Sequence, residues 1–292
     1  MQTTDSAGLK SWRRRIFLTL WITYASFYLC RVNLSVVIPK IVEDIGCTRS
    51  TMGVIGSIFF ITYAIGQFIN GQFADKRNAR FLILIGIFGS VCVNILFGLS
   101  STILTMAILW GINGYFQSMG WPPCVKVISN WFPHEKRGAI SGLFGTSYHF
   151  GNVISLFLAG SLLLYFKWRA VFWFPALLFL VSGVQFLILE KDNPESAGFN
   201  PEAKTEQDFL PAENSESGLR YFLVNPRLWQ IGFASLSLNI MAWGFLYWAP
   251  TYLYEKVSLS RRIYRCDELY RSCDRCFCGW ISSGQLRLAS GV

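Results

Sequence analysis

An arginine stands inside a long apolar stretch near the start of the chain. Arg31 follows Tyr28 by three residues and Tyr28 follows Tyr24 by four, so a helix would place all three side chains on one face. A guanidinium presents a planar fork of N–H donors that matches two oxygens of a phosphate or a carboxylate at once. We therefore expect two hydroxyls and one guanidinium to line a cavity that takes an oxyanion.

Two other basic side chains fall within apolar stretches. His149 can change its charge near neutral pH and hydrogen-bond a phosphate or carboxylate, and a packing role is an equal alternative. Lys126 lies near the end of its stretch, where a long side chain reaches water, and we favour that role over ligand binding. Gly-rich phosphate loops, nucleophile elbows and paired catalytic carboxylates are absent from the sequence, so we predict neither an enzyme nor a cofactor.

The composition indicates which elements must position these residues. Of the 292 residues, 52% are hydrophobic and only 15% are charged, which is too apolar for one water-soluble core. A helix that crosses a bilayer needs about 20 mostly apolar residues. The sequence therefore predicts an all-α, multi-pass membrane protein. Its predicted spans are Ile16 to Ile38, Met52 to Phe73, Phe81 to Leu99, Ile103 to Pro122, Ala139 to Phe166, Ala170 to Leu189 and Leu228 to Pro250.

Within these spans Arg31 is an exception. A charged side chain in the middle of a span costs about 2.5 to 3.5 kcal/mol on insertion scales, so it is a functional candidate by default. The first six predicted spans contain no Asp or Glu that could neutralise it. We therefore favour a bound anion over an internal ion pair as the partner of Arg31.

The formal net charge of +9 raises the question of nucleic-acid binding. Membrane proteins collect Lys and Arg in cytoplasmic loops, so the distribution between loops distinguishes the two explanations. With the N-terminus inside, the cytoplasmic loops hold Lys10, Arg13, Arg14, Arg15, Lys76, Arg77, Arg80, Lys136 and Arg137, and the outer loops hold Lys40, Arg49, Lys167 and Arg169. We predict no nucleic-acid partner, a cytoplasmic N-terminus and an inner or plasma membrane as the surrounding lipid bilayer.

The spans form two unequal groups. Residues 1–189 hold six spans with short loops, which we interpret as an N-terminal six-helix bundle. Residues 190–227 are polar and rich in proline and acidic side chains, as a cytoplasmic linker would be. Residues 228–254 then hold a seventh helix. This is the layout of transporters built from two six-helix halves, of which the second would only begin here.

Residues 255–292 have a different character and are predicted to form a tail outside the membrane. The tail is rich in Arg and holds half of the eight cysteines, namely Cys266, Cys273, Cys276 and Cys278. Their spacing lacks the paired Cys-x2-Cys knuckles of structural zinc sites, so we predict no metal site. We favour an out-of-frame or truncated end over a free tail.

Four motifs carry a family resemblance. The loop after the second span, with Gly71, Asp75 and Arg80, resembles the characteristic loop of the major facilitator superfamily, in which Gly permits close helix approach and the charges stay at the cytoplasmic surface. The other motifs resemble those of the organophosphate:phosphate antiporters, which include glycerol-3-phosphate and sugar-phosphate carriers. They are Gln117-Ser-Met-Gly-Trp121-Pro122-Pro123-Cys124, Trp131-Phe-x3-Lys136-Arg137-Gly138 and Asp192-x-Pro194-x-Ser196-x-Gly198.

The resemblance implies a fold, a substrate class and a site. It implies a rocker-switch exchanger of the major facilitator fold, in which an organic phosphate enters as inorganic phosphate leaves. It also implies that Arg31 binds the phosphate, that Tyr24, Tyr28 and Tyr63 are site tyrosines, and that His149 is the fifth-helix site histidine.

Two positions depart from the pattern of the glycerol-3-phosphate carriers. Gln67 stands where those carriers have a lysine, and Ala242 stands where they have an arginine. The predicted site is less positive as a result, which leaves sugar phosphates, phosphoglycerates and organic carboxylates open as substrates.

Alternative functions also remain open at this point. Arg31-Val-Asn33-Leu-Ser35 also resembles the anion:cation symporters of organic acids, so an organic-anion:proton symporter is one alternative. Others are a sugar-phosphate sensor of the same fold that does not transport, and a nonfunctional truncated product, because alternating access requires two bundles. A homodimer could supply the second bundle.

Overall fold

The computed structural model describes residues 2–76, 78–199 and 225–256, with the side chains of residues 2–7, 75 and 76 left aside. The described part is helical throughout. Its elements are α1 (Gln2–Phe27), η1 (Tyr28–Cys30), α2 (Asn33–Ile45), α3 (Arg49–Lys76), α4 (Ala79–Leu99), α5 (Ile103–Gln117), α6 (Trp121–Trp131), α7 (His134–Tyr165), α8 (Ala170–Leu189) and η2 (Pro194–Ala197), followed by an unlabelled helix, Pro226–Lys256.

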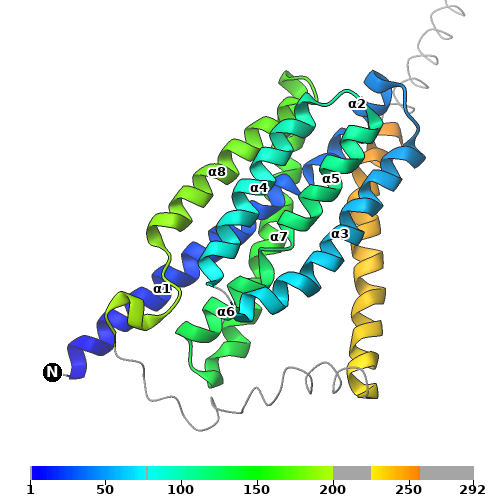
Figure 1. Ribbon diagram of the computed structural model, residues 1–292. Helices are drawn as coiled ribbons and strands as arrows, with labels where there is room; N and C mark the ends of the chain where they lie inside the picture. The colour runs from blue at the N-terminus through cyan, green and yellow to red at the C-terminus, as the bar shows by residue number, and fades with distance from the viewer. Residues whose placement is uncertain (1, 77, 200–224, 257–292) are drawn as a thin grey trace, which may run out of the picture.

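The helices form one elongated bundle (Figure 1). Helices α8, α4, α5 and α3 lie side by side in that order, and α1 and α7 pack together behind them. The helix Pro226–Lys256, coloured yellow to orange in Figure 1, stands at the edge of the bundle beside α3. The predicted seventh helix is therefore present, and it is the element least enclosed by the rest, with none of its most apolar window buried.

The helices long and apolar enough to cross a membrane number six among the described residues, where the sequence predicted seven. The difference is the predicted span Ile103 to Pro122, which the structure divides into α5 and α6. The division follows from Pro122 and Pro123, which have no backbone N–H to continue a helix from α5 but fit the first turn of a new one. The prediction of one continuous fourth helix was wrong.

The predicted first span, Ile16 to Ile38, is also interrupted. Helix α1 tightens into the 3-10 turn η1 at Tyr28, and α2 begins only at Asn33. Arg31 lies in this interruption, so the break is placed at the one charged residue of the span. Short 3-10 segments within a long helix often mark functional positions.

Two hydrophobic cores hold the bundle together. One contains Tyr24, Tyr28 and Phe144 and joins α1, α4, α6, α7 and α8. The other contains Phe97 and Trp110 and joins α2, α3, α4, α5, α7 and α8 towards the opposite end. Many apolar side chains instead point outwards, as Phe157 and Leu164 do with 77% and 78% of their surface exposed. A soluble protein rarely exposes such extensive apolar surface, which suits a helix bundle in lipid.

Some helices approach each other at glycines. A Cβ on Gly114 would lie 2.4 Å from the carbonyl oxygen of Phe59 in α3, and one on Gly151 would lie 2.4 Å from that of Ala25 in α1. Small residues let membrane helices pack this closely. Gly71 does not act in this way, because no described atom of another helix lies within 4 Å of its Cβ position. The expectation that Gly71 permits a close helix contact was wrong for this structure.

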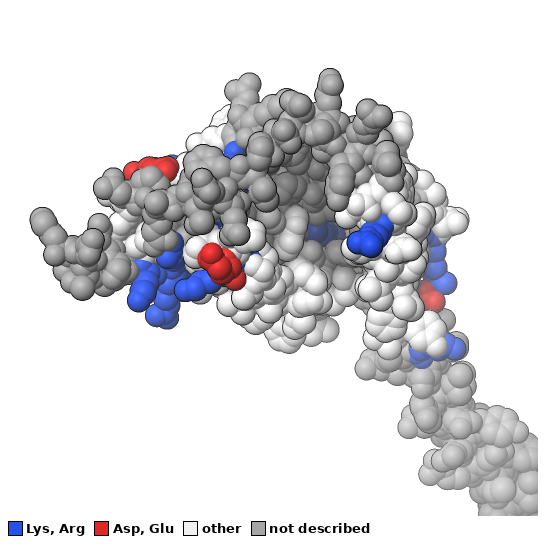
Figure 2. Space-filling model, turned by 90° about the horizontal axis from the view of Figure 1, so that it is seen from below, with Lys and Arg blue, Asp and Glu red and all other residues white. Residues whose placement is uncertain are grey.

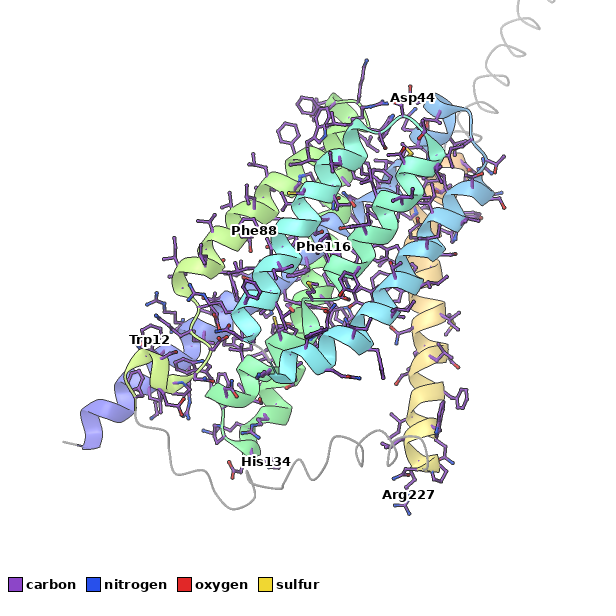
Figure 3. All side chains as sticks on the ribbon, viewed as in Figure 1. Trp12, Asp44, Phe88, Phe116, His134 and Arg227 are labelled. Carbon is purple, nitrogen blue, oxygen red and sulfur yellow. The ribbon has the colours of Figure 1, made fainter. Side chains whose placement is uncertain are left out.

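The two ends of the bundle differ in charge. Asp44 marks one end in Figure 3, and His134 and Arg227 mark the other, where α1 also begins. Seen from this second end in Figure 2, the visible Lys and Arg side chains outnumber the acidic ones. We call it the basic end. The helices that begin there carry most of the cations assigned to the cytoplasmic loops, namely Arg13, Arg14, Arg15, Arg80, Lys136 and Arg137.

Candidate functional site

The guanidinium of Arg31 is buried between two tyrosine rings. Its Cζ lies 4.5 Å from the ring centroid of Tyr28 and 4.6 Å from that of Tyr63, and only 5% of the residue is exposed. Each contact is within the range of a cation–π interaction, which strengthens when the cation is desolvated. No carboxylate of the described residues pairs with Arg31. The site therefore keeps its positive charge.

Two hydrogen bonds of the Arg31 side chain go to Gln117, the last residue of α5. Nε donates to the side-chain oxygen of Gln117 at 3.2 Å, and Nη2 donates to its backbone carbonyl at 3.4 Å. The last carbonyls of a helix lack intrahelical partners and favour a nearby cation, so the end of α5 is a suitable place for a guanidinium. In Figure 3, Phe116, the neighbour of Gln117, lies between the ends marked by Asp44 and His134, so this contact is deep in the bundle.

Gln117 belongs to a buried network of amides and one hydroxyl. Its Nε2 donates to Ser90 at 2.8 Å, and Ser90 donates to Asn113 at 2.6 Å. Asn94 also donates to Asn113, at 3.2 Å, and accepts from Asn33 at 3.2 Å. All five side chains are fully enclosed. Buried polar groups of this kind are stable only when their hydrogen bonds are made, so each member fixes the orientation of the next.

The same network holds the broken helix at Arg31. The carbonyl of Cys30, the residue before Arg31, accepts hydrogen bonds from Asn113 at 2.9 Å and from Asn94 at 3.5 Å. A carbonyl freed by a helix break would otherwise be unsatisfied in an apolar interior, at a cost of several kcal/mol. The network thus stabilises both the backbone and the side chain at this position.

Aromatic side chains enclose the site from the basic end. Tyr24 is 3% exposed and packs on Tyr28, Trp121 and Phe144, with ring centroids 5.9, 5.2 and 5.4 Å away. Trp121 begins α6, and the prolines that follow it, Pro122 and Pro123, fix the start of that helix. The predicted structural motif Trp121-Pro122-Pro123 therefore forms part of the wall next to the site tyrosines.

The helix Pro226–Lys256 contributes one residue to this arrangement. The ring of Trp243 stacks on Tyr28 with centroids 6.3 Å apart and planes 14° apart, and it meets Phe60 edge-on at 5.4 Å. Tyr28 thus has Arg31 and Trp243 as ring partners. Trp243 directly follows Ala242 in the sequence but was not among the predicted site residues.

The predicted site residues do not all meet. Tyr28 and Tyr63 contact Arg31 directly, whereas Tyr24 reaches it only through Tyr28. His149 is exposed, and its contact among the described residues is the ring of Tyr148, 3.9 Å away between centroids. Tyr148 in turn lies 6.3 Å from the ring of Tyr28. Lys126 bonds the carbonyl of Ala74 at 2.6 Å, near the end of α3.

The positions that depart from the glycerol-3-phosphate pattern are neutral here. Gln67 donates a hydrogen bond to the hydroxyl of Tyr63 at 2.6 Å, so this amide orients a residue that contacts Arg31. Ala242 is exposed on its helix. Neither position places a second cation beside Arg31.

The expected cavity at Arg31 is not observed. Tyr24, Tyr28 and Arg31 are each at most 5% exposed, because the aromatic wall covers them. A cavity of about 420 Å³ lies instead at the end marked by Asp44, and it is lined by Lys40, Glu43, Asp44, Leu163, Phe166, Lys167, Trp168 and Arg169. An anion could reach Arg31 only if side chains of the wall moved.

A second arginine occupies a different setting at the basic end. Arg80, in the first turn of α4, lies 3.8 Å from the fully buried carboxylate of Glu190, and its side chain donates to the carbonyl of Leu187. Its backbone N–H donates to Asp192 at 3.0 Å. Asp75, the other charged member of the predicted loop motif, has a side chain outside the described ones.

Burial controls the charge of these carboxyls. Removal from water raises the pKa of Glu190 to about 8, with a further contribution from nearby Asp192 against the opposing effect of Arg80. Burial also raises the pKa of Asp192, although the Arg80 N–H and charge oppose it. The cluster therefore changes its protonation near neutral pH.

A metal site is not evident in the described part of the chain, since no three of its His, Cys, Asp or Glu side chains gather. Its cysteines, Cys30, Cys47, Cys92 and Cys124, are free thiols. The cysteines of residues 257–292, for which metal was considered, lie outside the described residues.

The members of the polar network, which the search for charged site residues did not select, have a helical spacing that the sequence shows. Ser90 and Asn94 are four residues apart in a predicted span, and so are Asn113 and Gln117. This spacing puts each pair on one helical face, and polar side chains inside a span face the protein interior. These side chains carry no charge, so the rarity of charged residues in apolar spans does not single them out.

Comparison with known proteins identifies the family of this chain. The family model described as Major Facilitator Superfamily matches residues 20–285. A probable hexose phosphate transport protein of Chlamydia trachomatis is 32% identical over 84% of this chain and 58% of its own length. The glycerol-3-phosphate transporter of Bacillus subtilis is 31% identical over 94% of the chain and 66% of its length. The membrane sensor protein UhpC of Escherichia coli is 29% identical over 84% and 59%.

These names confirm the resemblance to organophosphate:phosphate antiporters that the motifs indicated. The chain spans 58 to 66% of the length of these relatives. A solved structure shows the same fold: a bacterial homologue of the human lysosomal transporter Spinster, inward-facing and unoccupied, has a TM-score of 0.69 at 17% identity over 83% of this chain and 55% of its own. The chain thus belongs to the Major Facilitator Superfamily, with the N-terminal six-helix bundle and the first helix of the second half.

Proposed function

We propose that Arg31 binds the phosphate group of an organic phosphate, and that the chain takes part in its exchange for inorganic phosphate across the membrane. The observation that carries the proposal is a buried guanidinium with two tyrosine rings and one amide residue around it, and no described carboxylate to neutralise it. A buried charge needs a counter-charge, and the planar fork of arginine suits a phosphate. The relatives named as hexose phosphate and glycerol-3-phosphate transporters support this substrate class.

The neutral side chains around Arg31 favour a sugar phosphate over glycerol 3-phosphate. Gln67 and Ala242 stand where the glycerol-3-phosphate pattern has cations, so phosphate binding depends on a single guanidinium. A substrate with several hydroxyls gains hydrogen bonds from tyrosines and amides without needing more positive charge. We include Tyr24, Tyr28, Tyr63 and His149 in the site on this basis.

The topology supports a cytoplasmic basic end. The cations of the loops gather where α1, α4 and α7 begin, which by the positive-inside rule supports a cytoplasmic N-terminus. In this proposal residues 1–189 form the bundle that carries Arg31, residues 190–227 form a cytoplasmic linker and residues 228–254 form the seventh helix. The alternating movement would need a second bundle, from a longer chain or a second copy.

The test separates binding from transport. The purified chain in lipid nanodiscs is titrated with radiolabelled inorganic phosphate, and glucose 6-phosphate, glycerol 3-phosphate and malate are added as competitors. We expect glucose 6-phosphate to displace phosphate at lower concentration than malate. Displacement by malate alone would contradict the proposal and favour the organic-anion symporter.

Proteoliposomes loaded with phosphate then report exchange of the same compounds. Uptake of glucose 6-phosphate that requires internal phosphate supports the antiporter. Uptake driven by a proton gradient without internal phosphate contradicts it. Binding without uptake would indicate the sensing function named for the UhpC relative.

A further inference from the structure

Gln117 holds Arg31 without neutralising it. Two hydrogen bonds of the guanidinium go to this one residue, at 3.2 Å to the side chain and 3.4 Å to the backbone. A guanidinium has five N–H donors, so these two leave donors for a ligand. A carboxylate in place of the amide would accept the same bond from Nε but would also supply a negative charge within hydrogen-bonding distance.

The orientation of the Gln117 amide is fixed by its neighbours. The side chain is fully buried, and its nitrogen donates to Ser90 at 2.8 Å, so its oxygen must face Arg31. Ser90 is fixed in turn by its bond to Asn113, and Asn113 donates to the Cys30 carbonyl beside Arg31. The chain of bonds therefore begins and ends at the same break in the first span.

From this geometry we propose that Gln117 is the positioning residue of the anion site, and that its neutral amide keeps the Arg31 charge available to the anion. The inference rests on the proposed function, because it names the residue that orients the phosphate-binding group. Gln117 acts through Arg31 and needs no contact with the substrate itself.

The decisive variant is Gln117→Glu, which keeps the size and the accepting oxygen but adds a charge. We expect its affinity for inorganic phosphate at pH 7.5 to fall at least about 30-fold, because the new carboxylate pairs with Arg31 and repels the anion. The affinity should recover as the pH is lowered and that carboxylate takes up a proton, which a merely structural role would not produce. Gln117→Met, which removes the bond without adding charge, should lose less affinity and show no such recovery.

Gln185→Glu is the matched control, since it makes the same change in α8 at a residue with no described contact to Arg31. It should bind phosphate as the unchanged chain does. Circular dichroism and gel filtration of each variant establish that it is folded. A folded Gln117→Glu variant that binds phosphate with unchanged affinity from pH 5 to 7.5 overturns the proposal.

Malate and sulfate are titrated in parallel to keep the two proposals apart. If the unchanged chain binds malate but no phosphate compound, the proposed function fails, and loss of malate binding in Gln117→Glu still supports the role of Gln117. If the unchanged chain binds none of these anions, both proposals are overturned.

Discussion

Arg31 and Arg80 show how one side chain is used in two ways within the same bundle. Arg80 lies at the basic end beside the buried carboxylate of Glu190, 3.8 Å away, and against Asp192 and the Leu187 carbonyl. Arg31 lies deep in the bundle, and its partners are tyrosine rings and the oxygens of Gln117. The guanidinium of Arg80 has acidic groups of the chain beside it, whereas that of Arg31 has none among the described residues.

The contrast between the partners of Arg80 and those of Arg31 indicates which arginine needs a ligand. A buried ion pair offsets its desolvation only if each charge has its partner and its hydrogen bonds. Arg80 has acidic neighbours within the chain, so it can serve structure alone. The cation–π contacts and the amide bonds of Arg31 stabilise the guanidinium in part but add no negative charge. In the proposed function, an anion from outside completes that site.

The strongest test of this contrast is removal of each guanidinium. Arg31→Ala should weaken phosphate binding about 100-fold or more, since loss of a buried charge partner costs roughly 2 to 5 kcal/mol. Arg31→Lys should retain part of the affinity because it keeps the charge but not the planar fork. Equilibrium titration with labelled phosphate measures both.

Arg80→Ala serves as the counterpart. It should lower the melting temperature, because the Leu187 carbonyl loses its side-chain donor, and leave phosphate affinity within about twofold. Equal loss of phosphate affinity in Arg31→Ala and Arg80→Ala would remove the distinction drawn between the two arginines.

The next test concerns the carboxyl beside Arg80. The pKa of Glu190 is raised from 4.5 to about 8, chiefly by burial, with Asp192 adding to the effect and Arg80 and Lys191 opposing it. Between these values the folded chain holds a proton that the unfolded chain has lost, so stability should fall as the pH rises, by up to about 1.4 kcal/mol per pH unit.

Thermal unfolding from pH 5 to pH 8 measures this slope. Glu190→Gln cannot titrate and should flatten the curve. A variant with the same slope as the unchanged chain would show that Glu190 is not the group responsible.

A smaller effect is expected from the amide network. Asn113→Leu is close in size but removes the shorter hydrogen bond to the Cys30 carbonyl and the acceptor of the Ser90 hydroxyl, so it should destabilise the fold by about 1 to 3 kcal/mol. Chemical unfolding in mixed micelles measures the change. Asn239→Leu, on an exposed helix face, is the control and should alter stability little.

The smallest expected effect comes from changing a tyrosine ring beside Arg31 while the Gln117 amide is kept. Tyr63→Leu removes one cation–π contact, which is worth about 0.5 to 2 kcal/mol, and should weaken phosphate binding by roughly twofold to thirtyfold. Tyr63→Phe keeps the ring and should recover most of this loss. If both variants bind equally poorly, the hydroxyl that accepts from Gln67 is the important group instead of the ring.

The sequence alone predicted the membrane helices well where the apolar run was uninterrupted. The span Ala170 to Leu189 agrees with α8 at both ends. Its accuracy has a simple cause, because bilayer thickness sets a length that can be counted in residues. The spans that contain Arg31 and Pro122-Pro123 were predicted as continuous, because their overall hydropathy conceals a local break.

The sequence also determined which residue carries the unusual charge. Arg31 is conspicuous because charges are rare in apolar spans, and no three-dimensional information was needed to select it. The tyrosines at its helical spacing followed from periodicity, and the contact with Tyr28 is observed.

The neighbours of Arg31 follow only from the tertiary structure. Tyr63, Gln117 and Trp243 come from three other helices, and no local pattern in the sequence reports which helix faces pack together. The closure of the aromatic wall over Tyr24 and the exposure of His149 likewise depend on helix packing. The physical reason is that a span's composition is set by lipid, whereas its neighbours are set by close contacts of side chains that are distant in the chain.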